Sequence, residues 1–225
     1  MSDSRAPRRR RWLPVLVFAF AVYVIVRAAN TPQGDTPPPP GSSASSSHAP
    51  TGGPSATAAA EAAFSYDPAD YTRQVRDRAR RTGVSARLLM AILYNESYKP
   101  HDPGLERAWQ KYRPDASFGI ANMHRAAFDE VKTGRDFADR RWEELPDDRD
   151  LAIEAEAWYL HDLGGRLPAE WPAAYDRNEL LALGYNTGAG TMPAFARGTP
   201  PGGQARTYLD KLHANWAEAG RAIGV

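Results

Sequence analysis

The sequence predicts an all-α fold with one globular domain. No stretch of useful length alternates apolar and polar residues as a half-buried strand does. Apolar residues instead recur every three or four positions, most clearly in the run LLMAILYNES at 88–97. Capping residues stand where such runs begin, as at Asp67 and Asp176, and glycines stand where they end. These three observations favour helices throughout a domain that we expect at 64–225.

The composition limits the classes of function. The chain has 225 residues, a formal net charge of +1 and no cysteine. This charge balance gives no indication of nucleic-acid binding, and without cysteine there is no disulfide, thiolate nucleophile or zinc–cysteine site. The five histidines do not fall at metal-binding spacings, and no phosphate-binding glycine motif occurs. We therefore expect neither a metal nor a cofactor, and the sequence carries no signal for an oligomeric state.

The N-terminal region predicts export and attachment to the cell membrane. A basic tail at 1–11 precedes an apolar segment at 12–29, whose only charged residue is Arg27. Because such basic flanks stay in the cytoplasm, the C-terminal domain is expected outside the membrane. The segment is either an uncleaved single-pass anchor, which we favour, or a signal peptide whose removal gives a secreted protein. Residues 30–63, rich in proline, serine and alanine, predict a disordered linker.

The first two helices have clear start and stop signals. Asp67 followed by proline is a good helix start, and Gly83 ends the apolar stripe that follows. Ser85 can cap the second helix. That helix must end near Pro100, because proline disfavours helical geometry at the residue before it. Residues 100–116 show no convincing period and predict a loop or short helical turns along a cleft.

The remaining helices follow the same logic. We expect them at 124–132 before Gly134; from Asp147 or Asp148 to Gly165, with Trp158 in the core; from a capping box of Asp176 and Glu179 to Tyr185; and around Tyr208, Leu212 and Trp216. Residues 193–203, rich in proline and glycine, predict a surface loop between the last two.

Glu96 is the unusual residue of the second helix. It lies four residues after Ile92 and three after Leu93, so it falls on the apolar stripe that faces the core. Burial and the negative end of the helix dipole both disfavour the anion, and we therefore expect a raised pKa for Glu96. A carboxylic acid that keeps its proton near neutral pH is suited to general acid catalysis.

Three later runs stand in order after Asn95-Glu96-Ser97. They are SFGIAN at 117–122, LGYNTG at 183–188 and RTYL at 206–209. Together, over about 66–216, the four runs resemble the catalytic domain of the soluble-type (SLT) lytic transglycosylases of the lysozyme-like superfamily. The resemblance implies a lysozyme-like helical domain that cleaves peptidoglycan glycan strands. The predicted N-terminal helix would tether this domain to the membrane.

The resemblance also implies roles for single residues. Glu96 would be the sole catalytic acid and base, and the substrate would be bound by Ser97, Gly119, Asn122, Tyr185, Asn186 and Tyr208. Asn122 departs from the family's pattern, which usually has glutamine there. Asparagine is one methylene shorter, so the sequence leaves open whether the hydrogen bond expected from that position forms.

In the mechanism that the resemblance implies, the acid protonates the oxygen between N-acetylmuramic acid and N-acetylglucosamine. The same group then takes a proton from the muramyl C6 hydroxyl, which closes a 1,6-anhydro ring. Two alternatives stay open. One is a hydrolytic muramidase, similar to goose-type lysozyme, with Asp102 or Asp115 as the second carboxylate. The other is a domain that binds glycan strands as a scaffold without cutting them.

Overall fold

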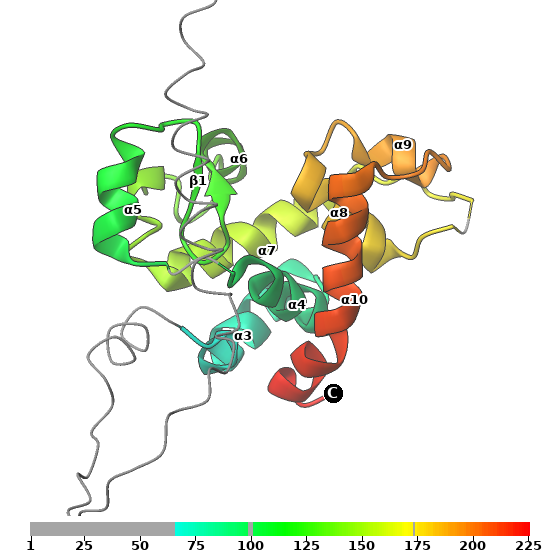
Figure 1. Ribbon diagram of the computed structural model, residues 1–225, viewed down its shortest axis with the longest axis horizontal. Coiled ribbons are helices and arrows are strands. Elements are labelled where there is room, and N and C mark those ends of the chain that lie inside the picture. Colours follow the sequence, from blue (N-terminus) through cyan, green and yellow to red (C-terminus); the bar gives the residue numbers. More distant parts are fainter. Residues whose placement is uncertain (1–65, 99–100, 173) are drawn as a thin grey trace, which may run out of the picture. The chain divides into compact units, whose positions relative to one another are not determined.

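A computed structural model describes residues 66–98, 101–172 and 174–225 (Figure 1). Helices dominate these ranges, in agreement with the predicted all-α class. The predicted basic tail, membrane segment and linker at 1–63 lie outside the described residues. Within the described ranges, no helix has the length and apolar character that a membrane crossing requires.

The described part contains helices and one short pair of strands. In chain order its elements are η1 (Pro68–Tyr71), α3 (Thr72–Thr82), α4 (Ala86–Glu96), α5 (Pro103–Gln110), β1 (Ser117–Phe118), β2 (Met123–His124), α6 (Arg125–Val131), η2 (Trp142–Glu144), α7 (Arg149–Gly165), α8 (Arg177–Thr187), α9 (Met192–Ala196) and α10 (Gly203–Ile223). β1 and β2 pair antiparallel. Strands of two residues are too short to alternate visibly in a sequence, which is why they were not predicted.

Several predicted start signals act as helix caps. Ser85 accepts a hydrogen bond from the backbone of α4 at 3.3 Å. Asp148, rather than Asp147, caps α7 and accepts a backbone N–H at 2.9 Å. Asp176 and Glu179 form both hydrogen bonds of the capping box at α8. Local side-chain chemistry therefore decides where these helices begin.

Two short helices lie in segments with irregular sequence: 100–116, predicted as a loop or short helical turns, and 193–203, predicted as a surface loop. α5 falls within 100–116, and its cap is Asp102, whose carboxylate accepts the Leu105 N–H at 2.6 Å. The face of α5 that carries Leu105 and Trp109 is largely exposed, so the helix has no apolar stripe turned to the core. α9 occupies the first part of the predicted loop at 193–203. Both helices have a proline in the first turn, which suits a helix start as well as a loop.

α4 forms the centre of the core. Its residues 88–93 are fully buried, and it packs against α3 and α10. α7 packs against α3, α6 and α8, and α8 packs against α9 and α10 (Figure 1). Trp158 of α7 lies at the edge of the core and is half-buried, with the Arg135 guanidinium 4.5 Å from its ring centroid.

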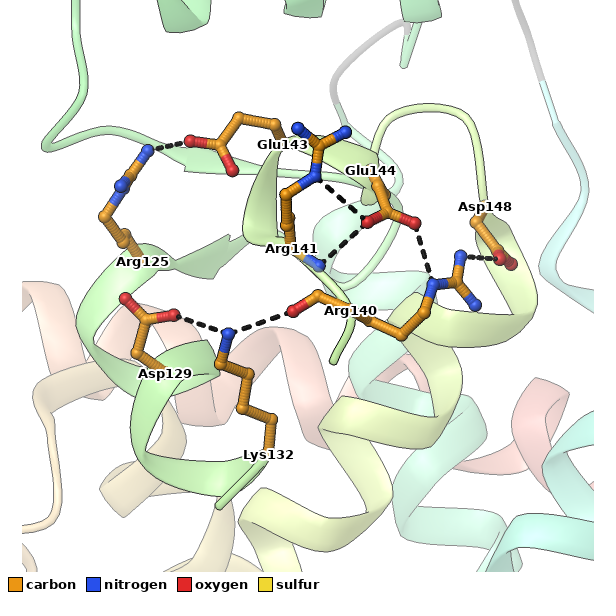
Figure 2. Close-up of polar contacts among 8 residues, drawn as sticks. All are labelled: Arg125, Asp129, Lys132, Arg140, Arg141, Glu143, Glu144 and Asp148. Atoms are coloured by element: carbon orange, nitrogen blue, oxygen red, sulfur yellow. Dashed lines mark hydrogen bonds and ion pairs between the residues drawn. The ribbon is translucent and has the colours of Figure 1, made fainter. Parts of the chain in front are cut away.

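Ion pairs hold the loop around η2 against α6 and the start of α7 (Figure 2). The Arg140 guanidinium contacts Glu144 and Asp148, each at 2.7 Å. The Lys132 ammonium donates to the Arg140 carbonyl at 2.9 Å, which ties α6 to the same loop. The loop carries Trp142, whose indole N–H donates to the β2 backbone at 2.9 Å. The network therefore helps to fix the β1–β2 segment.

Candidate active site

A cavity of about 570 Å³ opens beside the C-terminal end of α4. It is lined by Asn95, Glu96, Tyr98, Ser117, Asn122, His124, Tyr185, Asn186, Gln204, Thr207, Tyr208 and Lys211. These residues come from α4, from Tyr98 just after it, from the β1–β2 segment, and from α8 and α10. The fold therefore brings together the four runs that are separate in the sequence. Glu96 is the only carboxyl-bearing residue among the described residues that line this cavity.

The carboxyl group of Glu96 has one hydrogen-bond donor on each oxygen. The Asn122 amide donates to Oε2 at 2.9 Å, and the Tyr208 hydroxyl donates to Oε1 at 3.0 Å. Only 6 % of the Glu96 surface is exposed. The two donors stabilise the anion whereas burial destabilises it. These opposing effects suit a group that must both give and take a proton.

The backbone conformation of Asn122 lets its short side chain reach Glu96. Its φ is +51°, in the left-handed region that asparagine adopts more readily than most residues. The Ser117 hydroxyl donates to the Asn122 Oδ1 at 2.7 Å, which turns the amide nitrogen toward Glu96. The hydrogen bond that the loss of one methylene put in doubt is therefore present.

Tyr208 is held as a neutral donor. Burial, together with the negative charge of Glu96, raises its pKa well above the ordinary value for tyrosine. The Tyr208 backbone carbonyl accepts from the Asn95 amide at 3.1 Å, and Asn215 donates to the Asn95 Oδ1 at 2.7 Å. These contacts fasten α4 to α10 directly beside the carboxyl group.

Tyr185 and Asn186 reach the cavity from the last turn of α8. The Tyr185 hydroxyl donates to the Ala121 carbonyl at 2.5 Å and so supports the residue before Asn122. Burial, followed by the charges of Glu156 and Glu96, raises the Tyr185 pKa well above its ordinary value. The side-chain oxygen of Asn186 is buried and has no hydrogen-bond partner within the described ranges. It is a candidate acceptor for a ligand.

Ser97 and Gly119, both predicted to bind substrate, do not line the cavity. The Ser97 hydroxyl donates to the Tyr94 carbonyl at 2.8 Å. Gly119 has φ of +72°, and a Cβ there would lie 2.9 Å from the Leu145 carbonyl oxygen. The positive φ and the packing against Leu145 therefore both require glycine at this turn.

The two candidate second carboxylates lie outside this cavity. Asp102 caps α5, as described above. Asp115 is exposed and accepts from the Arg113 guanidinium at 3.3 Å, which lowers the pKa of that carboxyl group. Both line a neighbouring cavity of about 730 Å³ that does not include Glu96.

About half of the lining residues had no role predicted from the sequence. Ser117 and Thr207 belong to runs that we singled out, so their positions could have been inferred from the spacing. Four others belong to no motif: Tyr98 follows the end of α4, His124 lies on β2, and Gln204 and Lys211 lie on α10. Among the described residues, no cluster of histidine and acidic side chains could hold a metal ion.

Comparisons of this chain with models of protein families, with curated proteins and with solved structures found no match. The chemistry of the cavity is therefore the basis for assigning a function.

Proposed function

We propose that this chain is a membrane-tethered peptidoglycan lytic transglycosylase in which Glu96 is the only acid and base. The observation that carries the proposal is a cavity with one carboxyl group, held by a donor on each oxygen. Glycoside hydrolases normally place two carboxyl groups about the bond, ~5–5.5 Å or ~6.5–9.5 Å apart. A reaction that uses the same group twice fits a single carboxyl better.

In the proposed reaction, protonated Glu96 gives its proton to the oxygen that links N-acetylmuramic acid to N-acetylglucosamine. The bond from that oxygen to the muramyl C1 breaks, and the neighbouring N-acetyl group stabilises the positive charge at C1. The Glu96 anion, stabilised by Asn122 and Tyr208, then removes the proton of the C6 hydroxyl, whose oxygen bonds to C1. Glu96 is protonated again, and no water or cofactor enters the reaction.

The remaining lining residues would bind the substrate. The unpartnered oxygen of Asn186 can accept an N–H or O–H of a sugar, and a buried acceptor of this kind gains most when such a donor arrives. Tyr185 would act indirectly, because its hydroxyl is already bonded to the backbone next to Asn122. The predicted export of the C-terminal domain agrees with a substrate that lies outside the cell membrane.

The test is the incubation of the full-length chain with purified peptidoglycan, followed by measurement of soluble and bound material. We expect soluble glycan fragments to be released without added metal or cofactor. A chain that binds peptidoglycan but releases no fragments at acid or neutral pH would contradict the proposal and favour the scaffold alternative.

A further inference from the structure

His101 contacts the backbone of Glu96 rather than its side chain. Its Nε2 lies 3.1 Å from the Glu96 carbonyl oxygen, and its Nδ1 lies 2.9 Å from Oε1 of Glu106. The His101 side chain is 2 % exposed and that of Glu106 is 14 % exposed. His101 also has φ of +30°, an uncommon conformation for a residue with a side chain. The imidazole is therefore held tightly at the end of α4.

The neighbours of His101 define its protonation. A carbonyl oxygen can only accept, so Nε2 must carry a hydrogen. The contact between Nδ1 and a carboxylate oxygen of Glu106 also needs a proton between the two atoms. A neutral imidazole facing an ionised Glu106 has one hydrogen too few. Both contacts form together only when the His101–Glu106 pair holds this additional proton, on either of the two side chains. An imidazolium is also favoured at the negative, C-terminal end of α4.

The second oxygen of Glu106 connects this pair to the active site. It accepts the Gly119 N–H at 2.8 Å. The Gly119 carbonyl in turn accepts the Asn122 N–H at 2.8 Å, which closes the tight turn that carries Asn122. Asn122 donates to the carboxyl group of Glu96. A continuous series of contacts thus leaves the Glu96 carbonyl and returns at the Glu96 carboxyl, through His101, Glu106, Gly119 and Asn122.

We propose that His101 and Glu106 are a proton-dependent positioning pair that holds the turn at 119–122, and with it the Asn122 amide, against the carboxyl group of Glu96. The proposal deepens the proposed function, because it takes Glu96 as the reacting group. Loss of the shared proton breaks one of the two contacts of His101, which loosens the turn and withdraws a donor from Glu96. The pair would therefore make the active site sensitive to pH independently of the titration of Glu96.

Other ionisable side chains lie near the His101–Glu106 pair. Tyr66 packs edge-on against the His101 ring, with centroids 5.3 Å apart, and the Arg149 guanidinium lies 5.3 Å from the Tyr66 ring centroid. Burial raises the pKa of Tyr66 far above its ordinary value, so this side chain stays neutral. Asp102 is engaged as the cap of α5. Glu106 is thus the ionisable side chain that is hydrogen-bonded to His101.

The Glu106→Gln variant gives the sharpest test, because it reverses the proton requirement. The glutamine oxygen can accept the Gly119 N–H, and its amide can donate to Nδ1 of a neutral His101, whose Nε2–H still donates to Glu96. This network is complete only without the additional proton. We expect the variant to fold and to keep the turn ordered while His101 is neutral, and to lose that order when acid protonates His101.

The measurement is NMR of the full-length chain as a function of pH, following the His101 ring nitrogens and the side-chain amide of Asn122. In the wild type we expect the Asn122 signal to change when base removes the additional proton from the His101–Glu106 pair. In Glu106→Gln the Asn122 signal should instead change when acid protonates the His101 ring. If fragment release is observed, it should fall up to ~10²-fold wherever the turn is loosened.

His213 provides a matched control. It forms another histidine–glutamate contact, at 2.7 Å to Glu179, but its side chain is 54 % exposed and does not line the cavity. His213→Gln should leave the Asn122 signal and its pH dependence unchanged. An Asn122 signal that does not change when the His101–Glu106 pair loses its additional proton, or that follows the same pH dependence in the wild type and Glu106→Gln, would overturn the proposal. Neither result depends on whether the chain cleaves peptidoglycan.

Discussion

Two buried carboxyl groups in this domain have opposite surroundings. Glu96, at the end of α4, borders a cavity and has a donor on each oxygen. Glu156, in the middle of α7, has no exposed surface, and neither oxygen has a hydrogen-bond partner within the described ranges. Burial raises the pKa of Glu156 well above its ordinary value, and the negative charge of Glu96 adds to the shift.

The difference separates a carboxyl group that can change its charge from one that cannot. Donors on both oxygens allow Glu96 to exist as an anion despite its burial, so it can pass through both states of the proposed reaction. Glu156 has no such support and stays protonated, because an isolated buried anion is far too costly. Burial alone therefore does not identify a catalytic acid, and hydrogen-bond donors together with access to a cavity are the distinguishing features.

The largest expected effect comes from replacing Glu96 with glutamine. Glu96→Gln removes the group that gives and takes the proton, and we expect fragment release to fall ~10²–10⁴-fold. Glutamine retains an oxygen that can accept one hydrogen bond, so circular dichroism should show an intact fold. Glu156→Gln is the matched control at a buried position, and it should retain most of the activity. Equal losses in the two variants would remove the distinction between the two carboxyl groups.

Tyr208→Phe removes one of the two donors to Glu96. A hydrogen bond to a charged group contributes roughly 1.5–3 kcal/mol, so we expect activity to fall about 10- to 100-fold. The anion loses support, so Glu96 should keep its proton to a higher pH. The alkaline decline in activity should therefore move upward in the pH profile. Tyr94 lies on α4, as Glu96 does, but outside the cavity, so Tyr94→Phe should leave the pH profile unchanged.

Glu156→Gln should instead change how stability depends on pH. Because the folded state raises the pKa of Glu156, the stability associated with this group is fully present below the unfolded value of ~4.3 and is lost as pH rises toward the folded value. The wild type should lose about 1.4 kcal/mol for each pH unit in this window, and the variant should lack this loss.

Urea unfolding at a series of pH values measures the effect, with the exposed Glu170→Gln as the control. A constant difference in unfolding free energy between Glu156→Gln and the wild type across the series would mean that Glu156 ionises in the folded protein as it does in the unfolded chain.

The smallest effects are expected for the two aspartates of the muramidase alternative. Asp102→Asn should keep its helix cap, since asparagine caps as well as aspartate. Asp115→Asn removes an exposed ion pair, which contributes little. Each variant should retain most of the activity in the fragment-release assay. A large loss in either one, with the fold intact, would favour a mechanism with two carboxyl groups.

Features that depend on local side-chain chemistry could be predicted from the sequence. The caps at Ser85 and Asp176 and the position of Glu96 on the apolar stripe follow from spacing and side-chain type. The same spacing argument applies to Glu156, which lies three residues after Ile153 and four before Leu160, but we did not apply it. Asp102 followed by proline repeats the start signal of η1 and could have predicted α5.

Other features could not be read from the sequence. The left-handed backbone of Asn122 and its contact with Glu96 belong to a turn whose Gly119 packs against the distant Leu145. The link from His101 through Glu106 to Gly119 joins residues with no common period or motif. Strands of two residues leave no pattern at all. These features arise from tertiary packing, which propensity and periodicity do not contain.

The central claim is that one carboxyl group performs both proton transfers without water. Mass spectrometry of the fragments released from peptidoglycan by the full-length chain tests it most directly. We predict muramyl ends in the 1,6-anhydro form, each one water lighter than a reducing end, because the C6 hydroxyl of the sugar is the nucleophile. Fragments that end in reducing N-acetylmuramic acid would show that water attacks C1, and would contradict the single-carboxyl mechanism built on Glu96.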